Sequence, residues 1–305
     1  MKQRGLKFVA FHDIRWMKGA YYSHWAPLIP GQSNLSLSPA DLWKNVANNL
    51  ADARIQAALQ TQQSPSPDEM EAIVDAKSEP ERLAQSIALS LRNLDTSVEQ
   101  IASFYNEELT NKLADGKIDG SRSASTRDQA LYAQVHSFFL HFGAARDYLA
   151  TFIAFQLGKD RKRNDAMARL IENTRTADIE GSAILKSLAS KGYIAPRENT
   201  SGKWDIAGWL QQATELRNEL VHKRTYGQKL AERMGHLRPV DLENGLYRYF
   251  RPIALDDASN DVFDVIIEHY EKTNELFFAT VKASGFDASI PRVTEKDIIS
   301  IKKSM

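Results

Sequence analysis

Two long segments of the chain carry apolar residues at steps of three and four, the spacing of an amphipathic helix. The first follows the helix-start pattern Ser78-Glu79-Pro80-Glu81. Its apolar positions are Leu83, Ile87, Leu91, Leu94, Val98, Ile101 and Tyr105. The second segment starts near Thr126, and its apolar positions are Leu131, Val135, Phe138, Phe142, Ala145, Leu149 and Phe152. Stripes of this length predict two long helices packed into a common core.

Further helices are predicted on both sides of this pair. Ser38-Pro39-Ala40-Asp41 is a second helix start, and TQQSPSP over residues 61–67 ends that helix. A helix is also expected to begin at a capping Asp205. The remaining expected helices cover residues 165–173, 177–190 and 261–284. The first 37 residues are aromatic-rich and irregular, and strand alternation is almost absent from the chain.

These patterns predict an all-α fold. The glycine- and serine-rich loop over residues 114–125 is the expected domain boundary. We expect a helical N-terminal region over residues 1–115, a helical bundle over 125–285 and a C-terminal tail over 286–305.

Composition excludes several classes of protein. The chain has 305 residues and 43% hydrophobic content, which is enough for a buried core. Lysine and arginine number 39, as do aspartate and glutamate, so a polyanion would have to be held by a local patch. There is no cysteine, which excludes disulfides and cysteine nucleophiles and fits a reducing, cytoplasmic setting. No run of eighteen apolar residues occurs, so no membrane partner is expected.

The stretch TELRNELVHKRTYG, residues 214–227, carries the strongest functional signal. Asn218 and His222 are four apart and share one side of a helix, with Arg217 on the flank. An α-helical wheel places these residues away from the apolar stripe of Ile206, Trp209, Ala213, Leu216 and Leu220. The wheel therefore predicts that the polar residues face solvent, a ligand or another subunit.

Arg217, Asn218 and His222 are suited to cleaving a phosphodiester bond in RNA. Histidine can exchange protons with the 2'-hydroxyl or the leaving oxygen near neutral pH. A guanidinium can hold the charge that grows on the phosphoryl oxygens, and Asn218 could orient His222 or bind the phosphate. This chemistry requires no metal and no cofactor. A solvated helix face is the structural alternative, and it accounts for most polar faces of this kind.

The run R-N-E-L-V-H resembles the signature of the HEPN superfamily (higher eukaryotes and prokaryotes nucleotide-binding domain), with Arg217, Asn218 and His222 at the matching positions. The resemblance implies a helical bundle that forms a homodimer, with two copies of the motif lining one cleft. In active members it implies a metal-independent ribonuclease, which in prokaryotes is frequently a toxin or antiviral effector. An antitoxin or a sensor would then be a possible partner. Many relatives have lost activity.

The chain departs from one branch of that superfamily. In toxins paired with nucleotidyltransferase antitoxins a tyrosine stands two residues after the histidine, whereas this chain has Arg224 there and its nearest tyrosine is Tyr226. A polar residue from an earlier helix often joins the family's site, and the candidates are Arg146 and Asp147. A surface ion pair is the alternative for these two.

The segment YRYFRP, residues 247–252, interleaves aromatic residues with Arg248 and Arg251. These residue types stack on bases and neutralise phosphates, so Arg248 is a candidate RNA contact. A loop whose aromatic residues fill the core is the alternative. For the whole protein two functions stay open: an RNA endonuclease, and a helical interaction or ligand-binding module without chemistry.

Overall fold

The computed structural model describes residues 10–17, 19–27, 38–61, 65–198, 200–255 and 258–290. Of the expected C-terminal tail, residues 291–305 lie outside this described part. None of the described helices combines the length and the apolar character that crossing a membrane requires.

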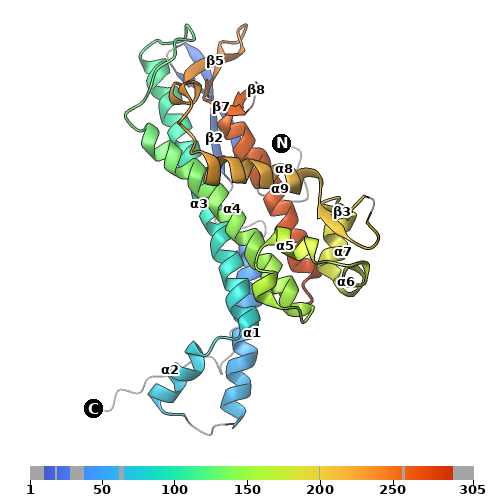
Figure 1. Ribbon diagram of the computed structural model, residues 1–305. Helices are drawn as coiled ribbons and strands as arrows, with labels where there is room; N and C mark the ends of the chain where they lie inside the picture. The colour runs from blue at the N-terminus through green and yellow to red at the C-terminus, as the bar shows by residue number, and fades with distance from the viewer. Residues whose placement is uncertain are drawn as a thin grey trace, which may run out of the picture.

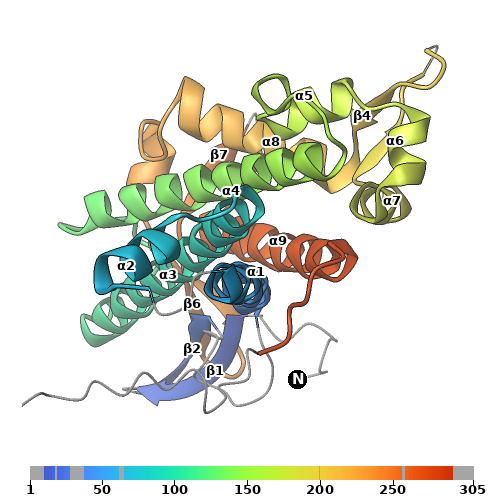
Figure 2. The same cartoon turned by 90° about the horizontal axis from the view of Figure 1, so that it is seen from below.

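The two long helices predicted from the apolar stripes form the centre of the molecule. They are α3 (Glu79–Ala114) and α4 (Asp128–Gln156), which pack along each other. Helices α1 (Pro39–Thr61) and α9 (Val262–Ala283) pack against this pair, as Figure 2 shows. Helix α2 (Pro67–Asp75) has no buried residue and projects with the end of α1 at the bottom of Figure 1. These long helices confirm the prediction from periodicity.

Buried side chains on both sides of the 114–125 loop belong to one hydrophobic core. Trp43 of α1, for example, contacts the ring of Phe152 of α4 edge-on, with 5.1 Å between ring centroids. The expected N-terminal region and the expected bundle therefore share their interior.

A group of short elements lies to one side of α4, at the right in Figure 1. It contains α5 (Met167–Glu172), α6 (Thr176–Gly181), α7 (Ala183–Ser190) and the hairpin of β3 (Ile194–Pro196) and β4 (Trp204–Ile206). Helix α8 (Gly208–Asn218) follows this hairpin.

The prediction that Asp205 caps a helix is wrong. Asp205 lies in β4, where its carboxylate accepts a hydrogen bond of 2.9 Å from Nε of Arg197 across the hairpin. Backbone pairing between β3 and β4 holds this residue in an extended conformation, so α8 begins only at Gly208.

The prediction of an all-α fold is also wrong, because the described residues include a four-stranded sheet. Its strands are β1 (Ala10–Met17), β2 (Ala20–Pro27), β6 (Leu246–Phe250) and β5 (His236–Asp241), in that order. Strands β2 and β6 are parallel and the other pairs are antiparallel. A second hairpin, β7 (Pro252–Leu255) with β8 (Ala258–Asp261), leads into α9.

One face of the sheet packs on α3, and aromatic residues lie on both faces. Tyr22 and Tyr249 are buried on this face, and Tyr249 contacts Tyr105 of α3 edge-on at 5.0 Å. Trp16 and Tyr21, however, are exposed and contact each other edge-on at 4.9 Å. Aromatic residues on both faces of short strands remove the alternation of apolar and polar residues that usually marks a strand.

Candidate active site at the end of helix α8

Helix α8 and the segment after it run antiparallel to α4. Thr214 accepts a hydrogen bond from Nη1 of Arg146, and the guanidinium of Arg217 lies over Gly143, one turn earlier on α4. Further on, Gly227 packs against the ring of Tyr132. The motif residues thus lie halfway along a continuous contact with α4.

A π-helical turn, Glu219–Lys223, replaces the expected end of α8. Its backbone bond joins the amide of Arg224 to the carbonyl of Glu219, five residues earlier, at 2.9 Å. In an ideal α-helix residues five apart are separated by about 140° around the axis. The wider turn reduces this separation, so the side chain of His222 comes above that of Arg217.

The three motif side chains meet at one guanidinium nitrogen. Nη1 of Arg217 donates to Oδ1 of Asn218 at 3.1 Å and lies 2.6 Å from Nε2 of His222. A guanidinium has only donors, so Nε2 is the acceptor in this contact. The neutral imidazole then carries its proton on Nδ1. The motif is therefore assembled within a single chain.

Only part of this group faces outward, which corrects the prediction from the helical wheel. His222 is exposed, whereas Arg217 and Asn218 are half-buried. Nε of Arg217 is buried against α4 and has no hydrogen-bond partner among the described residues. Position 143 must lack a side chain for this arrangement, because an ideal Cβ there would lie 2.7 Å from Nε of Arg217.

The charge of Arg217 has no acidic partner in the described part of the chain. Among the described residues no carboxylate pairs with Arg217, whose two partners are the amide of Asn218 and the imidazole of His222. Arg146 lies nearby, and its pKa is lowered first by burial and also by the charge of Arg217, although Asp147 acts in the opposite direction. Arg146 is buried, so Arg217 is the guanidinium whose charge favours binding of an anion.

Arg146 and Asp147 have different surroundings. Arg146 is only 4% exposed, and its Nε lies 3.6 Å from Oδ1 of Asp147. Asp147 accepts a hydrogen bond of 3.1 Å from the amide of Met167 at the start of α5. Arg146 therefore belongs to the contact between α4 and α8, and Asp147 serves the neighbouring short helix.

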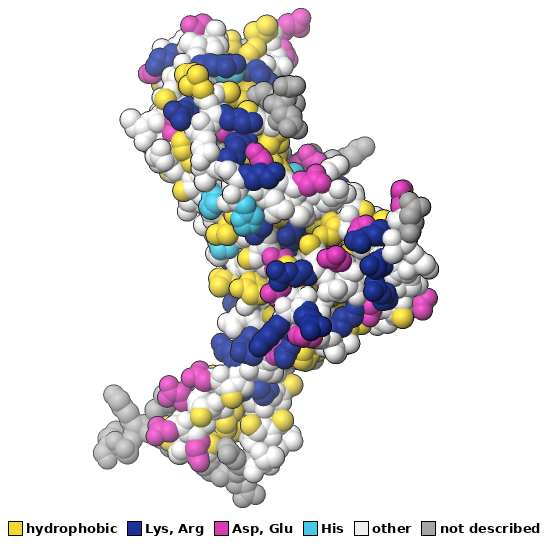
Figure 3. All heavy atoms as spheres, in the orientation of Figure 1, with side chains coloured by type: hydrophobic (Ala, Val, Ile, Leu, Met, Phe, Trp, Pro, Cys, Tyr) yellow, Lys and Arg dark blue, Asp and Glu magenta, His cyan; other side chains and the backbone are white. Residues whose placement is uncertain are grey.

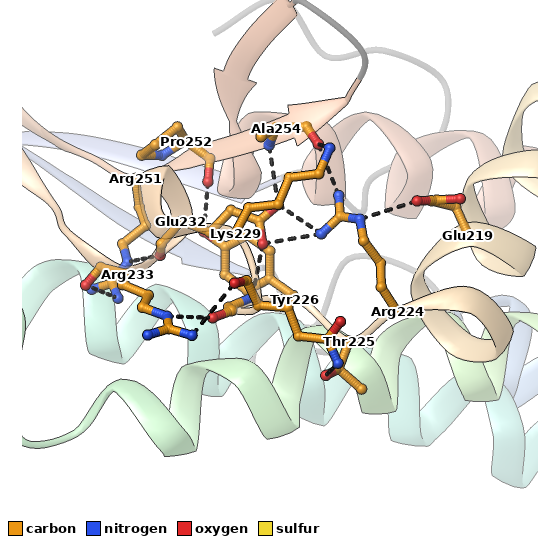
Figure 4. A network of polar contacts seen from close by, with 12 residues as sticks. Glu219, Arg224, Thr225, Tyr226, Lys229, Glu232, Arg233, Arg251, Pro252 and Ala254 are labelled. Carbon is orange, nitrogen blue, oxygen red and sulfur yellow. Dashed lines mark hydrogen bonds and ion pairs between the residues drawn. The ribbon is translucent and has the colours of Figure 1, made fainter.

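Arg224 and Tyr226 anchor the chain that follows His222, as Figure 4 shows. Arg224 donates to Glu232 at 2.8 Å, to Glu219 at 3.1 Å and to the carbonyl of Ala254 at 2.8 Å. The hydroxyl of Tyr226 donates to the carbonyl of Pro252 at 2.8 Å, and its side chain is buried. Both residues use their polar groups within the protein, which does not support a role in binding substrate.

Behind this anchor lies Arg251, which is fully buried. It donates to Oδ1 of Asp128 at 2.6 Å and to the hydroxyls of Tyr132 and Tyr249 at 3.0 and 3.2 Å. Burial acts to lower the pKa of Arg251, but the bonds to Asp128 and Tyr249 together outweigh it, so the pKa is raised. Arg251 therefore ties α4 to β6 from the inside and does not face an RNA ligand.

Arg248 lies in β6 and not in the contact between α4 and α8. Its Nη2 donates to Oδ1 of Asp264 at 2.7 Å and lies 3.6 Å from Asp261, at the start of α9. In the segment YRYFRP residues 247–250 belong to β6 and Pro252 starts β7, so the alternative of a loop is wrong, although Tyr249 and Phe250 are buried in the core as that alternative stated.

Two residues that support the site are not indicated by the sequence. Gly143 is surrounded by apolar residues of a long helix, and nothing in its neighbourhood indicates the contact with Arg217. Glu232 is completely buried and accepts bonds from Arg224 and from the amides of Gly227 and Ala254. A carboxylate in a sequence of mixed charge gives no sign of such burial.

The surface around the motif carries further charged and titratable groups. Figure 3 shows histidine side chains grouped near the crossing of α4 and α8, with Lys and Arg side chains below them on the same face. Within the described residues, no group of three or more histidine, aspartate or glutamate side chains is placed to hold a metal ion.

Comparisons of the chain with protein-family models, with curated proteins and with solved structures found no match. The likeness to the HEPN superfamily therefore depends on the sequence motif of Arg217, Asn218 and His222 alone.

Proposed function

We propose that this protein is a metal-independent RNA endonuclease whose active site contains Arg217, Asn218 and His222. The observation that carries the proposal is the meeting of Nη1 of Arg217 with Nε2 of His222 at 2.6 Å and Oδ1 of Asn218 at 3.1 Å. A guanidinium and an imidazole at this separation can contact one phosphodiester group together. The absence of an acidic partner for Arg217 among the described residues leaves its charge available to a phosphate.

In the proposed reaction His222 removes the proton of a 2'-hydroxyl, and the 2'-oxygen attacks the adjacent phosphorus. The bond from phosphorus to the 5'-oxygen breaks, and that oxygen takes up a proton. The products are a 2',3'-cyclic phosphate and a 5'-hydroxyl. Arg217 breaks its bond to His222 and donates to the phosphoryl oxygens instead, so that it stabilises the negative charge that grows on them. Asn218, which accepts a bond from Arg217, positions the guanidinium.

A homodimer is part of this proposal. His222 is exposed while Arg217 and Asn218 are half-buried, so the imidazole is the group most open to a second copy. If two copies meet across this surface, one His222 can act as base and the other can protonate the leaving oxygen. We further propose a cytoplasmic toxin or antiviral effector, held in check by an antitoxin or activated by a sensor.

The distribution of charge supports an RNA substrate. The chain as a whole is balanced, with 39 basic and 39 acidic residues. On the face that carries the histidines, Lys and Arg side chains lie among Asp and Glu side chains, as Figure 3 shows. The support for a polyanion comes from Arg217 itself, which has no carboxylate partner among the described residues.

The balanced charge also favours a second candidate, a non-catalytic interaction or ligand-binding module. In that case the surface around His222 would serve subunit contact, and substitution of His222 would alter assembly without affecting RNA. The two candidates are separated by whether the purified protein cuts RNA.

The test uses the purified full-length chain with an end-labelled single-stranded RNA. We expect cleavage by the parent chain and a loss of at least about 100-fold in Arg217→Ala and His222→Ala. Gln212→Ala, an exposed substitution on α8, is the matched control and should cleave like the parent. Folded Arg217→Ala and His222→Ala proteins that cleave at the parental rate would overturn the proposal.

A further inference from the structure

A groove of about 750 Å³ lies beside the motif, between the first half of α4 and the segment after the π-helical turn. The residues that line this groove include Gln129, Tyr132, His136, Thr225, Gln228 and Arg233. A volume of this size accommodates a small ligand such as a nucleotide.

The groove and the proposed active site are formed by the same two segments of the chain, although none of Arg217, Asn218 and His222 lines the groove. Thr225 follows His222 by three residues, and His136 precedes Gly143 by seven residues on α4. Seven residues are two helical turns, so His136 lies on the same side of α4 as Gly143, about 10 Å along the axis. An RNA strand whose cleaved bond lies at Arg217 would therefore reach the groove with a neighbouring nucleotide.

The lining of the groove offers uncharged hydrogen-bonding groups. Its one carboxylate, Asp128, is held by Arg251 at 2.6 Å. Gln129 is exposed, and the amide of Gln228 contacts only the hydroxyl of Thr225, at 3.1 Å, in a bond between exposed side chains. Amide groups present a donor and an acceptor together, which complements the edges of bases better than it complements phosphates.

A rigid wall and a single cation complete the groove. The ring of Tyr132 is backed by Gly227, and its hydroxyl accepts a bond of 3.0 Å from Arg251. Arg233 is exposed and is the only arginine or lysine among the lining residues. Its Nε and Nη2 donate to the carbonyls of Gly227 and Gln228 at 3.1 and 3.4 Å. These bonds hold the guanidinium at the rim.

We propose that this groove reads the base of a nucleotide next to the cleaved bond in single-stranded RNA. Gln129 and Gln228 bond to the base edge, and Arg233 holds an adjacent phosphate. The inference rests on the proposed nuclease function, and it adds that cleavage selects for a particular base.

Binding is measured with the full-length His222→Ala chain, which keeps RNA intact. Four fluorescein-labelled RNA hexanucleotides that differ only in one central base are titrated by fluorescence anisotropy. We expect one base to bind at least about fivefold more tightly than the weakest, the discrimination typical of paired hydrogen bonds to a base edge. Adding Gln129→Ala and Gln228→Ala should reduce this ratio below about twofold.

Two further variants in the same background sharpen the result. Gln211→Ala, an exposed glutamine on α8 outside the groove, should keep the parental ratio. Arg233→Ala should weaken all four oligonucleotides by a similar factor, because a phosphate contact carries no base information. Circular dichroism verifies that each variant is folded.

Equal binding of all four bases by the His222→Ala chain, or an unchanged ratio after loss of both glutamines, would overturn the inference. Failure of the His222→Ala chain to bind any of the four oligonucleotides would overturn it as well. These failures leave the nuclease proposal intact as long as Arg217→Ala and His222→Ala abolish cleavage. Retained cleavage in those two variants is the separate sign that the nuclease proposal fails.

Discussion

The guanidinium of Arg217 occupies the space above the Cα of Gly143, in the middle of the long helix α4. A methyl group at position 143 would displace the far end of a flexible side chain and leave the backbone in place. Replacing a helical glycine by alanine otherwise stabilises a protein by about 0.5–1 kcal/mol. Gly143→Ala should therefore raise the stability of the fold while it displaces Arg217 from its position in the site.

For Gly143→Ala we expect a melting temperature equal to or above that of the parent, with RNA cleavage lower by at least about tenfold. Thermal unfolding followed by circular dichroism and the RNA cleavage assay give the two values. Gly181→Ala is the control, because a Cβ there makes only an ordinary contact of 4.0 Å with Leu157. Full cleavage by Gly143→Ala would mean that the position of Arg217 is unimportant.

The buried carboxylate of Glu232 should stabilise the segment that follows His222. Glu232→Gln removes the charge that Arg224 meets at 2.8 Å and leaves the arginine inside the protein with a weaker partner. Breaking a buried pair of this kind costs roughly 3 kcal/mol. Unfolding in urea measures the loss. Glu219→Gln, at the partly exposed partner of the same arginine, should cost less than about 1 kcal/mol, and equal losses would contradict the account.

Asp95 should make the stability depend on pH. Burial raises the pKa of Asp95 to about 6, although the hydrogen bond from Tyr270 and the charge of Arg92 act to lower it. The folded protein thus binds this proton more tightly than the unfolded chain does. The resulting stabilisation is fully present below the ordinary pKa of 3.8 and is lost as the pH rises through about 6.

Asp95→Asn should therefore be more stable than the parent at pH 7.5, by roughly 1–3 kcal/mol. The amide oxygen can still accept the hydroxyl of Tyr270, whose bond to Oδ1 is 2.7 Å. Unfolding curves in urea at pH 7.5 and pH 4.5 provide the comparison, and the advantage should shrink at the lower pH. An advantage that grows on acidification would show that the carboxylate is not destabilised by burial.

Arg217→Lys tests whether charge alone is sufficient. Lysine keeps the positive charge, but its three donors radiate from one nitrogen, so it lacks the planar fork with which the guanidinium can hold Asn218 and bind a phosphate at two oxygens. We expect the cleavage rate to fall about 100-fold while binding of RNA by anisotropy changes less than about fivefold. If this variant cleaved RNA at the parental rate, the positive charge at position 217 would be sufficient and the guanidinium geometry would be unimportant.

Helical periodicity predicted α3, α4 and α9 well, because each buries a long stripe against its neighbours. Helix α1 buries residues only within 39–47, and its bounds followed from the helix-start and helix-end signals. Local patterns do not indicate the sheet, because β5 and β6 are short and because aromatic residues such as Tyr21 and Tyr249 lie on both of its faces. Strand pairing depends on residues far apart in the chain, as between Tyr21 and Leu246. The pattern of neighbouring residues in the sequence therefore does not predict this pairing.

The sequence identified which motif residues would come together but not how. The wheel assumed α-helical geometry up to His222, whereas the chain forms a π-helical turn from Glu219. The contact of Arg217 with Gly143 and the burial of Glu232 both depend on packing between segments that are far apart in the sequence. Arg224, Tyr226 and Arg251 matched the residue types of an RNA-binding surface, yet burial assigns them to the interior.

The central claim is that His222 and Arg217 direct a 2'-hydroxyl against its own phosphodiester bond. It is tested most directly by the ends of RNA fragments produced by the full-length chain in excess EDTA, analysed by mass spectrometry. We predict 2',3'-cyclic phosphate and 5'-hydroxyl ends from the parent chain, and no fragments from His222→Ala. Intact RNA from the parent chain, or fragments with 5'-phosphate ends that His222→Ala also produces, would contradict the claim.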